Sequence, residues 1–367
     1  MLPMWMLAVF WLIVATAFIG GLYLAFRAPS LLGGRQSSAV QDALKLSLTC
    51  AAAAGTVLAG VYAYRKQQIE EASSRRADDA ALNLRFTSAS DQLGSQSAAV
   101  RLAGAYAMAS LADDWIEQRQ MCVNVICAYL RMENQGDDVS EIRVREAITS
   151  IIRERTQIGR TQSWSALDYD LTGAHLHNLD LSECVFSGKL ISFSRAVFSG
   201  ILTTFEGARF ESERTSFSDC AFTADNTRFN HCTIAARQIW FERLDIRGRA
   251  WLDYLHTSGE IISFADSKIS GDRFSLAGAN LSSNEIILER IQFTGERAAF
   301  SRCTFGGATS FRDSTFTGTQ IWFEDARLLG PSVSFEGARF ENAVRLSGIR
   351  VDPQCDLSPG PLDFPVQ

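Results

Sequence analysis

The chain has 367 residues, and with 47% hydrophobic and 10% aromatic residues it is too apolar for an intrinsically disordered protein. This length leaves room for two or three structural units. With 35 basic and 41 acidic residues the formal net charge is −6, and no basic stripe is evident, which disfavours a protein that binds nucleic acid directly.

Two uncharged apolar segments stand at the start of the chain. The first, at about residues 4–26, is long enough to cross a hydrocarbon core of ~30 Å. A signal peptide is the alternative, but the basic first region that it requires is absent. The second segment, at about residues 46–64, is Ala-rich and barely long enough, so a buried soluble helix is its alternative. We expect two transmembrane helices within residues 1–66.

Basic residues near these segments indicate an orientation. The loop between the segments carries two, Arg27 and Arg35, whereas four follow the second segment: Arg65, Lys66, Arg75 and Arg76. Because basic residues favour the cytoplasmic side of a membrane, this excess predicts a cytoplasmic C-terminal body.

Residues 67–160 are expected to form a helical module. Apolar residues recur at helical spacing from Cys122 to Leu130 and again from Val144 to Ile152. The polar sequence "ENQGDD" separates these two runs. The predicted helices span 97–112, 115–131 and 141–155. We expect the module to close the N-terminal end of the element that follows, with a partner-docking site as the alternative.

From residue 165 to residue 351 large apolar residues recur at steps that alternate between five and seven. The heptapeptide "FEGARFE" at 205–211 stands again at 335–341. Such steps fit neither the 3.6-residue period of a helix nor the strict alternation of a long strand. They fit short extended segments between tight turns, each directing one large side chain inward. The predicted core ladder is Leu171, Leu176, Leu181, Phe186, Phe205, Phe210, Phe217, Phe222, Phe229, Phe241, Phe264, Phe300, Phe305, Phe323, Phe335 and Phe340.

Small residues tend to stand two positions before every second large residue. Cys184, Cys220, Cys232 and Cys303 occupy such positions, where cysteine acts as a compact apolar filler. The eight cysteines show no paired spacing of a secreted disulfide framework, so we expect reduced thiols, consistent with the cytoplasm. The stretch 247–263 interrupts the repeat and is expected to be irregular.

On these residues the chain resembles pentapeptide-repeat proteins. The sequence "LTGAHLHNLDLSECVF" has apolar residues at strict intervals of five, and the later units of about twelve residues resemble the Phe-rich variants of the family. The resemblance implies an all-β, right-handed quadrilateral β-helix over residues 165–351, with four large residues in each coil. The two extra residues of each unit are expected to bulge at alternate corners. Residues 352–367 are expected to be a Pro-rich C-terminal cap or tail.

The helical module carries a second resemblance. Its sequences "QLGSQSAAVRLAGAYAMASLADD" and "VICAYLR" are similar to a module of bacterial membrane-bound pentapeptide-repeat proteins. This resemblance implies a multi-pass protein of the bacterial inner membrane, with its C-terminal body in the cytoplasm.

No constellation for catalysis is evident. His175 and His177 flank an inward leucine and could bind a metal, although such a pair on a strand is more often solvated. No Walker loop, dinucleotide fingerprint, metalloprotease motif or nucleophile elbow occurs. A rod packed with phenylalanine also leaves no interior pocket. We therefore expect no enzyme, no catalytic, cofactor-binding or metal-binding residues, and no cofactor.

The expected function is a non-catalytic, membrane-anchored scaffold or protein-binding solenoid with an unknown protein partner. The family resemblance raises a DNA-mimic regulator or protector of a topoisomerase as the alternative. Residues 165–351 hold 23 acidic and 19 basic residues, a weak excess beside duplex DNA with one charge per ~1.7 Å. An enzyme of unrecognised class is the second alternative. No nucleic-acid partner is expected, and a homo-oligomer stays open.

Overall fold

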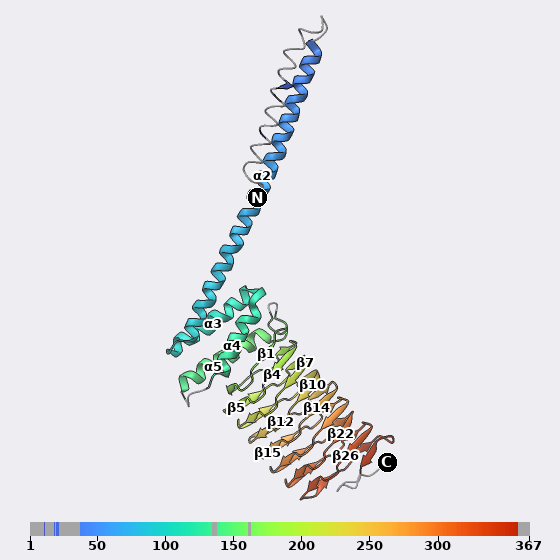
Figure 1. Ribbon diagram of the computed structural model, residues 1–367. Coiled ribbons are helices and arrows are strands. Elements are labelled where there is room, and N and C mark those ends of the chain that lie inside the picture. Colours follow the sequence, from blue (N-terminus) through green and yellow to red (C-terminus); the bar gives the residue numbers. More distant parts are fainter. Residues whose placement is uncertain are drawn as a thin grey trace. The chain divides into compact units, whose positions relative to one another are not determined.

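The computed structural model describes residues 37–133, 138–160 and 163–358, together with positions 11, 18, 20 and 21. The chain divides into two compact units, Met1–Ala81 and Leu82–Gln367. Along the chain, a long helix is followed by shorter helices and then by a stack of short strands (Figure 1).

Helix α2, Ser37–Leu93, begins in the first unit and ends in the second. It passes without a break through the boundary expected after residue 66 and contains the second predicted transmembrane segment, 46–64. The first predicted segment, 4–26, lies outside the described residues apart from four positions. Within the described part of the chain, no helix has both the length and the apolar character needed to span a membrane.

The second unit begins with a helical module. Its elements are the end of α2, α3 (Ala98–Asp114), the 3-10 helix η2 (Ile116–Gln118), α4 (Arg119–Arg131) and α5 (Val139–Thr156). Met108, Ile126 and Ile148 are completely buried where the apolar faces of α3, α4 and α5 meet. At the start of α5 the Asp138 carboxylate accepts a hydrogen bond from the Ser140 amide, which caps the helix.

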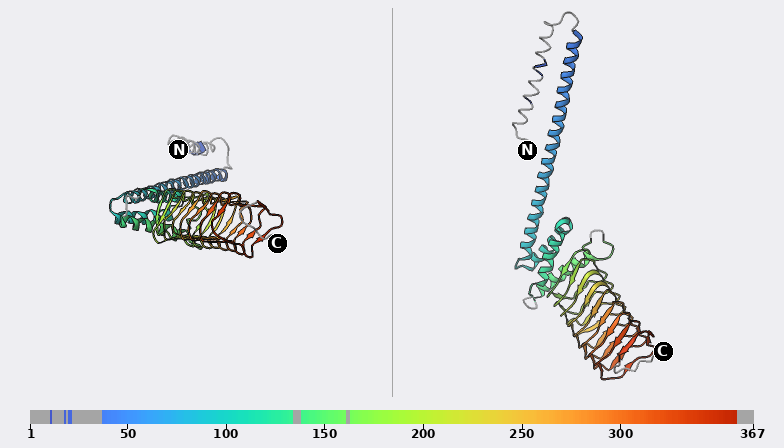
Figure 2. Two further views of the ribbon diagram at one scale, coloured as in Figure 1. Left: turned by 90° about the horizontal axis from the view of Figure 1, so that it is seen from below. Right: turned by 45° about the vertical axis from the view of Figure 1, so that its right-hand side comes forward.

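The rest of the second unit is a β-solenoid, and Figure 2 shows its strands stacked as successive coils. The strands form four columns, within which neighbours pair in parallel. The predicted β-solenoid behind a small helical module is therefore confirmed. The β2 face contains eight strands, one from each coil: β2 (His175–His177), β5 (Val197–Ser199), β8 (Ala221–Phe222), β11 (Asp245–Ile246), β15 (Lys268–Ile269), β19 (Gln292–Phe293), β23 (Thr315–Phe316) and β27 (Arg339–Phe340).

The other three columns follow the same order. The β6 face comprises β6 (Leu202–Thr204), β9 (Asn226–Arg228), β12 (Arg249–Trp251), β16 (Arg273–Ser275), β20 (Arg297–Ala299), β24 (Gln320–Trp322) and β28 (Val344–Arg345). The β3 column comprises β3 (Val185–Phe186), β7 (Arg209–Ser216), β10 (Thr233–Trp240), β13 (His256–Ser258), β17 (Asn280–Leu281), β21 (Thr304–Phe305), β25 (Arg327–Leu328) and β29 (Arg350–Val351). The last column shares β7 and β10 and adds β1 (Tyr169–Asp170), β4 (Leu190–Ser192), β14 (Ile261–Ser263), β18 (Glu285–Ile287), β22 (Ala308–Ser310), β26 (Ser332–Ser334) and β30 (Asp356–Ser358).

The register explains the sequence period. Arg209 lies opposite Thr233, 24 residues later, and Thr233 lies opposite His256, 23 residues later. Two steps of five and two of seven fill one such coil, so four large residues turn the chain once. Each five-residue step contains a tight turn, as at Phe193, whose carbonyl oxygen accepts a hydrogen bond from the Ala196 amide at 2.9 Å. The residue between, Arg195, takes a φ of 60°.

The seven-residue steps differ from the expected bulges. On the β6 face each contains a short strand with one more inward side chain, such as Thr203, Ala250 or Phe274. The extra residues therefore widen the core, because an extended backbone sends every second side chain inward. At the corner before β20, the coils approach so closely that a Cβ on Gly295 would collide with the Gly271 carbonyl oxygen.

The stretch 247–263, predicted to be irregular, forms regular coil structure instead. Leu252 and Thr257 take the positions of the large residues, and both are buried. The step from Ile246 to Leu252 has six residues, and the inward residue at 257 is polar. These two departures hide the repeat in the sequence.

Stacked rings run along the interior. The Phe193, Phe217, Phe241 and Phe264 rings stack with centroids 4.9 Å apart at each step and interplanar angles of 4–6°. Each ring fills the space that the ring of the next coil would otherwise leave exposed. Burial of one Phe contributes roughly 1.5–3 kcal/mol, so the column stabilises the stack as a whole.

Candidate functional site

The predicted core ladder lies inside the solenoid. Every one of its residues is buried except Phe340, which is half-buried on the last coil. These side chains touch one another and so define the scaffold, and groups that could meet a partner lie elsewhere.

The helices cover the first coil of the solenoid. Helix α4 contacts β1 and β2, and α5 contacts β2. Tyr169 and Leu171 are buried although they belong to the first coil. Trp164 donates from Nε1 to the Asp113 carboxylate at 2.9 Å, and Arg155 forms an ion pair with the same carboxylate at 2.9 Å. The module therefore shields the open N-terminal end of the stack.

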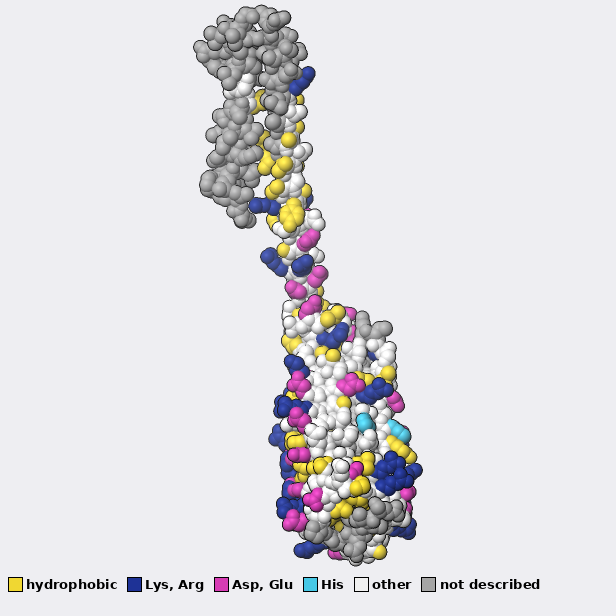
Figure 3. Space-filling model, turned by 90° about the vertical axis from the view of Figure 1, so that its right-hand side faces the viewer, with side chains coloured by type: hydrophobic (Ala, Val, Ile, Leu, Met, Phe, Trp, Pro, Cys, Tyr) yellow, Lys and Arg dark blue, Asp and Glu magenta, His cyan; other side chains and the backbone are white. Residues whose placement is uncertain are grey.

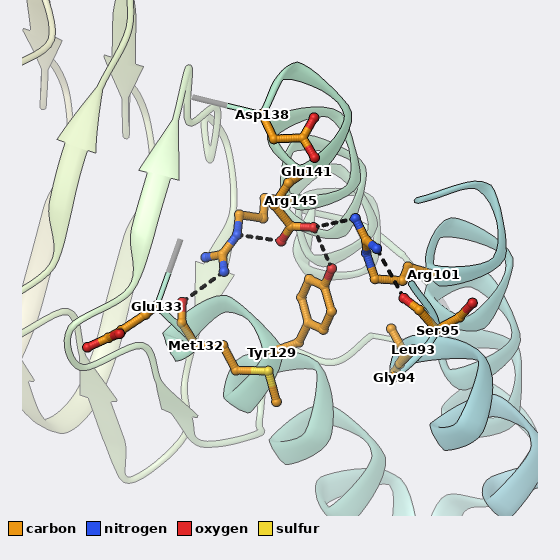
Figure 4. Close-up of a pocket in the computed structure, with 10 residues that line it drawn as sticks. All are labelled: Leu93, Gly94, Ser95, Arg101, Tyr129, Met132, Glu133, Asp138, Glu141 and Arg145. Carbon is orange, nitrogen blue, oxygen red and sulfur yellow. Dashed lines mark hydrogen bonds and ion pairs between the residues drawn. The ribbon is translucent and has the colours of Figure 1, made fainter. Parts of the chain in front are cut away.

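A pocket of about 330 Å³ lies within the helical module, between the end of α2, α3, α4 and α5 (Figure 4). At its centre the Glu141 carboxylate accepts three contacts. They come from Arg101 Nη2 at 3.0 Å, Arg145 Nε at 2.8 Å and the Tyr129 hydroxyl at 2.8 Å.

The two guanidinium groups of this pocket also bind backbone carbonyls. Arg145, only 3% exposed, donates to the carbonyl oxygens of Leu130 and Met132 at 2.9 and 2.8 Å. Arg101 donates to the carbonyl oxygens of Ser95 and Gln96. The network thus joins α5 to the end of α4, and α3 to the loop after α2.

The electrostatics of this pocket favour a structural role. Burial, and then the contact with the Glu141 carboxylate, raise the pKa of Tyr129 to about 12, so its hydroxyl is a neutral donor. Because three donors occupy the Glu141 carboxylate, it is poorly placed to act as a general base. Leu93, Gly94, Arg101 and Tyr129, which carry the resemblance of the module, all line this pocket. The sequence offered no signal for their convergence with Glu141.

An ordered ladder of charges runs along one edge of the solenoid. Its members take the third position of the tight turn in successive coils: Arg195, Asp219, Arg243, Asp266, Arg290 and Asp313. Arg243 binds the Asp219 carboxylate through Nε at 2.6 Å and Nη2 at 2.9 Å. These hydrogen bonds hold the pKa of Asp219 below its usual value. Figure 3 shows basic and acidic side chains interspersed over the surface of the solenoid.

A groove of about 400 Å³ opens on the β6 face. Trp251 and Trp322 are half-buried at its two ends, and Arg273, Arg297 and Arg302 lie along its sides. The sequence analysis missed this groove. Its residues come from four coils, and only the coil register brings them together.

Histidine and cysteine form no metal centre in the described ranges, where no group of three or more His, Cys, Asp or Glu side chains could hold an ion. His177 Nδ1 lies 3.2 Å from the Ser199 hydroxyl. The seven described cysteines are free thiols, and burial raises the pKa of Cys184 to about 11 and of Cys220 to about 12. Such thiols are poor nucleophiles at neutral pH.

Comparison with known proteins agrees with this architecture. The family model described as pentapeptide repeats (9 copies) matches residues 171–220, which form the early coils of the solenoid. No curated protein and no solved structure matches the chain. The fold and the match together define a pentapeptide-repeat β-solenoid.

Proposed function

We propose that this chain is a non-catalytic, membrane-anchored scaffold whose solenoid binds a protein partner. The groove of the β6 face carries the proposal. It presents two half-buried Trp side chains and three Arg side chains on a rigid parallel sheet. Trp and Arg are enriched among the residues that dominate binding energy at protein interfaces. Solenoids provide extended surfaces of this kind.

The chemistry of the described side chains supports binding over catalysis. The buried cysteines have raised pKa values, and the Glu141 carboxylate is occupied by two guanidinium groups and a phenol. A nucleophile hydrogen-bonded to a base, as covalent catalysis requires, is not among the described contacts.

The membrane anchor is the second part of the proposal. The uncharged segments at 4–26 and 46–64, followed by Arg65 and Lys66, support two spans in a bacterial inner membrane, with both termini in the cytoplasm.

Fractionation of bacteria that express the full chain with a C-terminal tag tests this anchor. The chain should stay with membranes after carbonate extraction, and the tag should resist protease added to spheroplasts. A variant that lacks residues 1–66 should be released, which provides the control. Release of the full chain by carbonate, or digestion of the tag in intact spheroplasts, would contradict the anchor or its orientation.

Site-specific photocrosslinking in living cells tests the scaffold. A benzophenone amino acid at Ala299, in the groove, should give a discrete adduct, whereas the same probe at Thr294, exposed near the β2 face, should not. An adduct of twice the chain mass would identify a second copy as the partner. Absence of adducts from probes on all four faces would refute the scaffold. Inhibition of gyrase supercoiling by the purified chain would replace it with the DNA-mimic alternative.

A further inference from the structure

The groove of the β6 face has a shape that follows from side-chain size in successive coils. Trp251 lies opposite Ser275, and Ala299 lies opposite Trp322. Two coils with small side chains therefore separate two coils with indole rings. At ~4.8 Å per strand the two Trp positions are about 14 Å apart, which is the span of about four extended residues. Ser275 and Ala299 form the floor and are each 6% exposed.

The walls of the groove are held in place before any ligand binds. The Arg297 guanidinium lies 4.3 Å from the centre of the Trp322 ring, and that of Arg345 lies 5.2 Å from it. The Arg297 Nε also donates to Gln320 Oε1 at 2.7 Å. Arg228 lies over the Trp251 ring at 5.9 Å. A site with ordered walls loses little conformational entropy when it binds.

Positive charge in this groove is not neutralised as it is on the charge ladder. Arg249, Arg273 and Arg297 occupy the same position in neighbouring strands, so three like charges lie side by side. Like charges directly opposite each other destabilise a sheet. Among the described residues, Arg273 and Arg302 have no ion-pair partner, whereas Arg243 and Arg290 of the ladder each bind an aspartate through two nitrogens.

The carboxylates of the groove limit what it can accept. Asp253 accepts hydrogen bonds from the Ser275 hydroxyl and the Ala277 amide, and Glu324 lies 3.6 Å from Arg345. Asp325 also lines the groove, and two further carboxylates lie beside the arginines in an adjoining pocket: Asp272 and Glu296. A polyanion with uniform charge, such as a nucleic acid, would meet these carboxylates along its length. A peptide can place one carboxylate at an arginine and a neutral side chain elsewhere.

We propose that this groove binds an extended peptide segment of the partner protein, in which an acidic residue stands close to an aromatic one. The acidic side chain pairs with Arg273 or Arg302, and the aromatic ring lies on the floor between Trp251 and Trp322. Aromatic packing against an indole and a charge-assisted hydrogen bond from a guanidinium are the two contacts that the walls offer. This inference rests on the proposed scaffold function and names the surface and the partner chemistry.

Peptide selection on the purified full chain in detergent tests the groove. A phage-displayed library of random peptides is selected on the immobilised chain, and the enriched peptides are synthesised with a fluorophore for anisotropy titration. Enriched peptides should carry Asp or Glu near Trp, Tyr or Phe. The double variant Arg273→Glu/Arg302→Glu should weaken their binding at least tenfold, and so should Trp322→Ala.

A matched charge reversal on another face provides the control. Arg247→Glu, exposed near the β2 face, should leave the affinity within about twofold, since rim charges far from a ligand contribute little. Circular dichroism and thermal unfolding verify that each variant folds.

Several results would overturn the inference. They are peptides that bind the double variant as tightly as the wild type, enrichment without acidic residues, or tighter arginine-dependent binding of a single-stranded oligonucleotide or polyphosphate. If any of these occurs while crosslinking maps a partner to another face, the inference fails and the scaffold proposal stands. Absence of adducts on every face overturns the scaffold itself.

Discussion

The interior ring column predicts that one Phe matters far more in the middle of the solenoid than at its end. Phe217 stacks on Phe193 and on Phe241 at 4.9 Å, so truncation removes contacts with both neighbouring coils. Phe217→Ala should lower the free energy of unfolding by about 4 kcal/mol, because it leaves a cavity in a closely packed core. Phe340 is half-buried and stacks on Phe316 at 5.0 Å, so Phe340→Ala should cost only about 1–2 kcal/mol.

Urea unfolding of the full chain in detergent, followed by circular dichroism, measures both values. Amide hydrogen exchange then shows whether protection is lost mainly in β7–β11, as nearest-neighbour coupling between coils predicts. Phe217→Leu serves as the conservative control and should cost less than about 1.5 kcal/mol. A loss below about 1 kcal/mol for Phe217→Ala, or equal losses at both positions, would refute a closely packed ring column.

Three further predictions concern the turns, the charge ladder and the helical pocket. Gly295→Ala should destabilise the solenoid by about 1–3 kcal/mol, measured by urea unfolding, because its Cβ would collide with a carbonyl oxygen of the previous coil. Asp219→Asn should cost about 0.5–1 kcal/mol at pH 7 through the loss of its pair with Arg243. Because the folded-state pKa of Asp219 is lowered, this stabilisation is present above the pKa of the unfolded chain, about 4, and is lost as the pH falls through the folded-state pKa; equal stability of both proteins at pH 7 would contradict it. Glu141→Gln should cost about 3–5 kcal/mol in thermal or urea unfolding, because it leaves the buried Arg145 without its carboxylate, and a loss near zero would show that the network is not a clamp.

The periodicity of the chain predicted much of the solenoid. Steps of five and seven locate the large inward residues from Leu171 to Phe335, because each coil repeats one local geometry. The same count missed the inward residues in the middle of the β6-face strands, such as Thr203 and Phe274. Their chemical types vary from Thr to Ala to Phe, so no apolar signal marks the position. The core there accepts different sizes as long as neighbouring coils compensate.

The surface sites were beyond the reach of sequence reasoning. Trp251 and Trp322 are 71 residues apart in the chain, and nothing local indicates that they close one groove. The alternation of Arg and Asp along the ladder is equally hidden, since each member lies about one full coil from the next. In the helical module, Arg101 meets Glu141 only because α3 and α5 pack together.

By itself, the sequence determined that a stack of short strands with an apolar interior would form, since the large side chains recur at the interval of one turn and must be buried. The tertiary structure decided which exposed residues become neighbours. That outcome depends on a register of 22 to 24 residues between coils, and a difference of one residue in any step changes every contact on the outer face. The burial of apolar residues is a local and repeated requirement, whereas the Trp and Arg groove exists only after several coils have closed.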